Sequence, residues 1–226
     1  MDGKVSPTGN LILNPIQQSP ALYGDNFWEN VKEGLPTINL DRKILLWRLR
    51  NFPNLLRGLY RVAIARLLKV PHYYGVLSLK VIKADGTILD YGTASFRVVT
   101  DVGVAFIVDA FQNTTELENL KFHGVGTDNT AEAAGDTALN TELTTEYVVD
   151  NTRATGTTIE GATGNIYRTV ATNTFDAAVA LVEHGILSQA ATGGGTLLDR
   201  TVFGIINLSS GDSLQTTYDL TFTAGS

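Results

Sequence analysis

The chain has no cysteine, only three histidines among its 226 residues, and no long apolar run. The absence of cysteine excludes disulfides, thiolate metal sites and thiol catalysis, and it suits synthesis in a reducing cytoplasm. Nowhere do about 18 uncharged apolar residues follow one another, as a membrane-spanning helix requires. The first residues also lack the apolar core of a secretory signal. We therefore expect a protein that is made in the cytoplasm and has no membrane partner.

Motifs for catalysis and for metal or cofactor binding are missing as well. His72, His123 and His184 share no spacing that would place two ligands on one metal, and a zinc site needs three or four. The oxygen-rich stretch 128–136 lacks the alternation and the glycine of an EF-hand loop, so we expect a solvated acidic loop. The triple glycine at 193–195 is not followed by the lysine of a phosphate loop. We predict no catalytic residue, no metal and no cofactor.

Charge is distributed unevenly along the chain. Residues 1–70 hold ten Lys and Arg against five Asp and Glu, a net charge of +5, whereas residues 71–226 hold seven against 18, a net charge of −11. This asymmetry predicts that the basic part faces an acidic partner surface. The acidic part suits nucleic acid poorly, because attraction to phosphate dominates that affinity, so we expect no nucleic-acid partner.

The first 40 residues predict an extended arm, because Asn, Gln, Pro and Gly recur and no helical or strand period persists. Large apolar side chains nevertheless punctuate the arm, among them Phe27 and Trp28. Burying one such side chain is worth roughly 1.5–3 kcal/mol. We therefore expect the arm to lie against its own domain or against a neighbouring subunit.

Residues 41–71 form the most helical stretch, a basic amphipathic segment. Asp41 is a candidate N-cap, and Pro53 predicts an interruption, giving two helices at about 42–51 and 54–69. Three interpretations stay open for this segment: a helix packed on its own domain, a clamp between subunits, or a helix bound to a membrane surface or nucleic acid.

Residues 72–226 have the pattern of a β domain. Strands are predicted at about 74–83, 88–99, 119–125, 143–154, 164–172, 179–188, 196–208 and 214–223, with a hairpin turn at 84–87. A short helix over 104–111 is led by Thr100 or Asp101 as its cap. Short antiparallel strands at near-regular spacing favour a mainly β fold, an antiparallel β-sandwich of the jelly-roll type.

One part of this domain resembles a known class of proteins. A strand at 120–127 ends in a Gly-Thr turn, residues 129–139 follow with a Thr-Ala and an Asp-Thr-Ala-Leu motif, and Ser-Gly-Asp-Ser-Leu-Gln at 210–215 opens the last strand. This order resembles a module of structural proteins of tailed bacteriophages. The resemblance covers about residues 98–224, and its motifs are turns and strand edges rather than a site.

The resemblance implies a non-catalytic subunit of the virion. We expect a cement or decoration protein on the capsid exterior, which clamps neighbouring copies of the major capsid protein and itself forms a homotrimer. A tail-side adaptor or fibre base, and a glycan hydrolase carried on the particle, are the alternatives. Aromatic and Arg side chains most often carry interface energy. The predicted interface residues are Trp28, Arg42, Lys43, Trp47, Arg48, Arg50, Phe52, Arg57, Tyr60 and Arg61.

Overall fold

The computed structural model describes residues 41–69, 72–161 and 163–224. The arm predicted for residues 1–40 lies outside the described residues. The described part is mainly β, with antiparallel strands in two sheets that pack together, as predicted. Its elements are α2 (Arg42–Leu67), β1 (His72–Ile82), β2 (Ile88–Val99), α3 (Asp101–Phe111), the 3-10 turn η1 (Leu117–Asn119), β3 (Phe122–Gly126), β4 (Ala154–Thr155), β5 (Thr157–Glu160), β6 (Ile166–Thr174), β7 (Val179–Leu187), β8 (Leu197–Leu208) and β9 (Ser213–Thr223).

The strands follow one another in space in the order β4-β3-β7-β8-β2-β1-β9-β6-β5. β2 and β8 join the two sheets through a short pairing, in which Val98 lies opposite Arg200 and Val99 opposite Asp199. The two ends of this order, β4 and β5, flank Gly156 in the chain. A Cβ at Gly156 would overlap the Thr169 hydroxyl, so only glycine lets the chain cross here from one sheet to the other.

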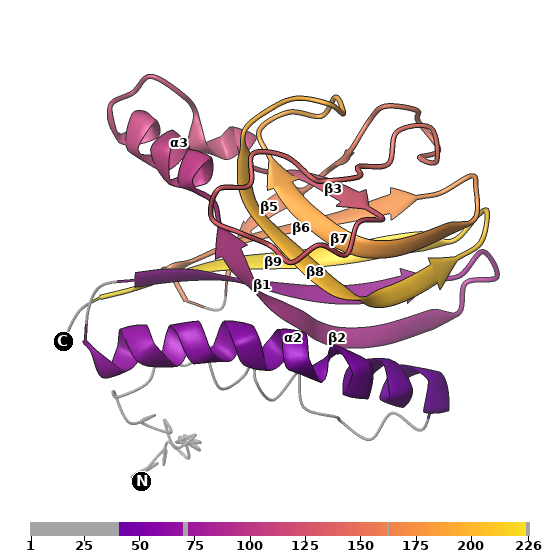
Figure 1. The fold of residues 1–226 in the computed structure, drawn as a ribbon. Coiled ribbons are helices and arrows are strands. Elements are labelled where there is room, and N and C mark those ends of the chain that lie inside the picture. The colour runs from indigo at the N-terminus through magenta and orange to yellow at the C-terminus, as the bar shows by residue number, and fades with distance from the viewer. Residues whose placement is uncertain (1–40, 70–71, 162, 225–226) are drawn as a thin grey trace, which may run out of the picture.

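The two helices lie at different places on the sheets (Figure 1). Helix α2 runs along β2 and also contacts β8, and α3 packs on β8 near the end where β8 begins. Thr100 caps α3 as predicted, because its hydroxyl accepts a hydrogen bond from the Gly103 amide at 3.0 Å. Apolar side chains fill the space between the sheets, where Leu77, Val125 and Leu181 are fully buried.

Two element predictions were wrong. Helix α2 is continuous through Pro53, because buried residues on both sides of the proline, including Ile44 and Leu55, hold one helix against the sheet. The strand predicted at 143–154 is mostly irregular, and only Ala154 belongs to a named strand. Side chains supply contacts in this segment: Arg153 binds the Glu142 carboxylate and donates to the carbonyl oxygen of Gln189 at 2.8 Å.

Candidate interaction surface on helix α2

The inner face of α2 is fixed to the sheet by specific contacts. The Trp47 indole is 7% exposed, donates to the carbonyl oxygen of Gly204 at 2.7 Å and packs edge-on against Tyr91. Asn51 donates to the Ala94 carbonyl oxygen at 2.6 Å and accepts from the Gly204 amide at 2.9 Å. These contacts set the rotation of the helix about its own axis and therefore decide which residues face outward.

A glycine lets α2 approach β2 closely. A Cβ at Gly58 would overlap the Cβ and the carbonyl oxygen of Phe96. Leu55 and Val62, one turn to either side, are buried against Tyr74 and Phe96. The helix is therefore seated by its backbone as well as by its side chains.

The outer face of α2 carries a second row of apolar side chains. The apolar side chains of this amphipathic segment are divided between the two faces, since Leu55 packs inward while Leu56 and Tyr60 point outward. Exposure reaches 64% at Leu49, 68% at Tyr60 and 81% at Leu67. Steps of three, four and seven residues place the outward side chains along one line of an α-helix. This outer stripe consists of Leu45, Leu49, Phe52, Leu56, Tyr60 and Leu67.

Basic residues flank the outer stripe, since α2 contains six arginines and one lysine but no Asp or Glu. The predicted cations Arg42, Lys43 and Arg50 are exposed. Arg48 instead donates to the carbonyl oxygen of Tyr91 at 3.2 Å, and Arg57 binds the Glu132 carboxylate at 2.7 Å.

Of the other predicted interface residues, Phe52 and Tyr60 lie on the outer stripe, whereas Trp47 is buried inside the chain. Trp28 and the side chain of Arg61 lie outside what the structure describes. The structure therefore brings together five accessible candidates on one helix: Arg42, Lys43, Arg50, Phe52 and Tyr60.

A buried polar network between the sheets was not predicted from the sequence. Arg97 forms an ion pair with Asp199, and both side chains are fully buried. The Arg97 guanidinium also donates to Nδ1 of His184 at 2.6 Å. Nε2 of His184 lies 3.1 Å from Nδ1 of His123, which also accepts from the Thr216 hydroxyl at 2.7 Å.

The network fixes the protonation of both histidines. Because a guanidinium can only donate, Nδ1 of His184 carries no proton and its Nε2 donates to His123. Burial and the nearby Arg97 charge lower the pKa of His123 to about 3 and hold the pKa of His184 well below its usual range. Burial raises the pKa of Asp199 to about 6, although Arg97 opposes the shift. Both imidazoles are therefore neutral at pH 7.

One signal in the sequence points to this network. The dipeptide His-Gly occurs twice, at 123–124 and 184–185, and the two copies lie on neighbouring strands, since Gly124 pairs with Gly185 between β3 and β7. Arg97 and Asp199 gave no such signal, because their pairing depends on the junction of β2 with β8. Among the described residues, no group of three His, Asp or Glu side chains could hold a metal ion.

The acidic stretch 128–136 differs from its prediction. Glu132 is buried against Arg57, and Asp136 binds Arg200 at 3.1 Å, so this loop is held by arginines rather than fully solvated. Arg200 itself is fully buried and binds Glu183 at 2.7 Å. Arg57 and Arg200 therefore hold the stretch 128–136 against the rest of the protein through ion pairs.

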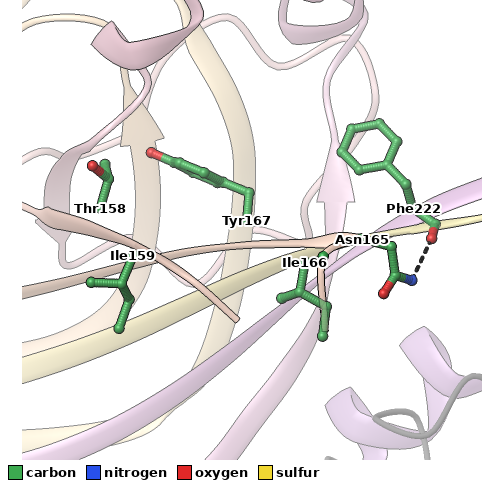
Figure 2. Close-up of a pocket in the computed structure, with 7 residues that line it drawn as sticks. Thr158, Ile159, Asn165, Ile166, Tyr167 and Phe222 are labelled. Atoms are coloured by element: carbon green, nitrogen blue, oxygen red, sulfur yellow. Dashed lines mark hydrogen bonds between the residues drawn. The ribbon is translucent and has the colours of Figure 1, made fainter. Parts of the chain in front are cut away.

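A hollow of about 620 Å³ lies where β5, β6 and the end of β9 meet (Figure 2). Ile159, Tyr167 and Phe222 line it, and the Asn165 amide donates to the carbonyl oxygen of Phe222 at 2.8 Å. None of the described residues that line this hollow is charged. The hollow offers a ligand apolar contacts and backbone groups. Its described lining lacks the charged side chains that α2 offers beside its apolar ones.

No protein-family model matches the chain, and no curated protein or solved structure matches it either. Within the described part of the chain, no helix is both long and apolar enough to cross a membrane.

Proposed function

We propose that this protein is a non-catalytic structural subunit that docks on a partner protein through the outer face of α2. One observation carries the proposal: the outer stripe is a row of exposed apolar side chains on a helix that has seven cations and no acidic residue. Soluble monomers rarely expose large contiguous apolar patches, and such patches mark interaction sites. A fitting partner offers an apolar groove bordered by carboxylates.

The partner surface differs from α2 itself. Two copies of α2 that met face to face would bring two rows of cations together, and like charges in contact cost affinity. Residues 71–226, with a net charge of −11, and an acidic surface on another protein both have the complementary sign. The charges therefore favour a heterologous contact over a symmetric pairing of helices.

The setting that we propose is the virion of a tailed bacteriophage, as the resemblance over residues 98–224 implies. There the protein would act as a cement protein on the capsid exterior, with the major capsid protein as its partner, a homotrimeric body, a jelly-roll strand path and an arm over residues 1–40. A helix that presents both apolar and cationic groups suits a subunit that clamps an acidic shell surface. Repeated weak contacts around a shell sum through multivalency.

Two variants with equally exposed apolar side chains test this docking. Leu49→Glu places a carboxylate on the outer stripe, whereas Val149→Glu changes a side chain of the same 64% exposure in a different segment. We expect Leu49→Glu to lower incorporation into particles at least tenfold, measured by quantitative mass spectrometry, and Val149→Glu to leave incorporation unchanged. Both variants should keep the thermal midpoint of the wild type. Normal incorporation of Leu49→Glu would show that the outer stripe is not the docking surface.

A further inference from the structure

A second surface of α2 forms a groove with the sheet, along the flank of the helix that carries Lys43, Leu46 and Arg50. The groove has a volume of about 670 Å³ and lies between the first turns of α2, the start of β2 and the later part of β8. Leu46, Trp47, Tyr91 and Ile205 form its apolar lining. Ile205 is 58% exposed although it belongs to a strand whose other residues are mostly buried. The groove thus leaves apolar side chains uncovered next to the contact between the inner face of α2 and the sheet.

Three cations border the same groove. Lys83 binds the Asp212 carboxylate at 2.7 Å, whereas Lys43 and Arg50 are exposed and have no ion pair with another described residue. A ligand that matches this groove therefore combines an aromatic or aliphatic group with carboxylates on either side of it. A purely apolar ligand would leave the cations unmatched, and a purely acidic one would leave the lining uncovered.

We propose that residues 25–29 of the same chain occupy this groove. They carry two aromatic side chains, Phe27 and Trp28, between two carboxylates, Asp25 and Glu29. This order of acid, aromatic pair and acid complements a groove of apolar lining and cationic border. On this inference Trp28 is an anchor within its own chain, and residues 1–24 are left to reach a partner.

The connection to α2 allows this placement. Twelve residues separate Trp28 from Asp41, the N-cap of α2. At about 3.3–3.6 Å per extended residue they can span roughly 40 Å. The first turns of α2, which border the groove, cover about 12 Å at 1.5 Å per residue. A tethered segment also has an effective concentration in the millimolar range, so a weak contact is enough to fill the groove in cis.

Cross-linking of the purified full chain tests the placement, and the natural absence of cysteine makes the test clean. One variant carries Asn26→Cys with Ile205→Cys in the groove, and its control carries Asn26→Cys with Phe111→Cys, an exposed side chain at the end of α3. With a short bismaleimide we expect at least tenfold more cross-linking within one chain for the groove pair. Equal yields for the two pairs would overturn the inference, as would products that join two chains in place of one.

A charge exchange tests the chemistry of the contact. Adding Lys43→Glu and Arg50→Glu to the groove pair should lower its cross-linking at least fivefold, and further adding Asp25→Lys and Glu29→Lys should restore it. Loss without restoration would show that the carboxylates do not face these cations. The experiment uses the isolated protein, so its failure is distinguishable from a failure of particle docking.

Discussion

At the scale of single residues, the most consequential feature is a pair of neutral histidines that an arginine holds in one tautomer. A proton on Nδ1 of His184 would point at the guanidinium of Arg97, itself a donor 2.6 Å away. A proton on Nδ1 of His123 would likewise oppose the donor on His184, 3.1 Å away. The folded state therefore excludes a proton that the unfolded chain binds readily below its ordinary histidine pKa of 6.5.

This exclusion makes stability depend on pH in a predictable direction. Between pH 6.5 and about 3 the unfolded chain holds a proton on His123 that the folded chain lacks, so the free energy of unfolding falls with falling pH. One such proton is worth about 1.4 kcal/mol per pH unit. Asp199 acts in the opposite sense between its folded pKa of about 6 and its ordinary 3.8, because there the folded state holds the extra proton.

We predict that His123→Gln reduces the loss of stability on acidification. Between pH 6 and 4 the gap in unfolding free energy between the wild type and this variant should change by about 1.4 kcal/mol per pH unit, because one titrating group has been removed. Urea unfolding at several pH values measures it. His72→Gln, at the start of β1 and outside the network, serves as the control. Parallel pH profiles for His123→Gln and the wild type would mean that the folded protein accepts the proton.

At the scale of elements, α2 is positioned by close backbone approach rather than by helix propensity. Gly58 is the point of approach, where an added Cβ would meet the Cβ and the backbone of Phe96. Alanine favours an isolated helix over glycine by about 1 kcal/mol, whereas overpacking a core contact costs typically 1–3 kcal/mol. Because the obstructing atoms belong to the base of a buried side chain and its backbone, the packing cost is the larger.

We therefore predict that Gly58→Ala destabilises the protein by up to about 2 kcal/mol, although it improves the propensity of the helix. Ala63→Gly, at an exposed position of the same helix, measures propensity alone and should cost about 1 kcal/mol. Chemical denaturation of both variants gives the comparison. A stabilised Gly58→Ala protein would contradict the close packing of α2 on β2.

The elements that could be predicted from sequence are those whose signals are local. Thr100 as a cap, the hairpin at 84–87 and the strands predicted at 74–83 and 214–223 each depend on residues that are neighbours in the chain. The continuity of α2 through Pro53 could not be predicted, because contacts of its inner face with β2 and β8 override the local breaker. The strand expected at 143–154 failed for a similar reason, since side-chain contacts replace strand pairing there: Arg153 pairs with Glu142 and donates to the carbonyl oxygen of Gln189.

The candidate surface was predicted only in part, and the reason is again geometric. The composition of residues 41–71 predicts a helix with basic and apolar side chains. Which of these side chains face outward depends on the rotation of α2 about its own axis, which the contacts of Trp47 and Asn51 set. Trp47 looked like an exposed anchor and is instead a core residue. Leu49 and Leu67 are among the most exposed side chains of the outer stripe. Their exposure could not be predicted from the residue type, because leucine is most often buried.

At the scale of the whole molecule, a basic helix lies along an acidic β domain and keeps a second apolar row turned to solvent. The charge is thus divided between α2, which has seven cations and no acidic residue, and residues 71–226, which have a net charge of −11. The acidic part forms the folded body, and the basic part seats the helix and presents its outer stripe. A subunit built in this way suits repeated docking on a larger assembly.

The copy number of the protein in purified particles tests the virion role most directly. Quantitative mass spectrometry, scaled to the major capsid protein, should give a number comparable with that of the shell subunit, because a cement protein occupies repeated sites on the shell. A few copies per particle would contradict the cement position, and absence from the particle would contradict the structural role as a whole.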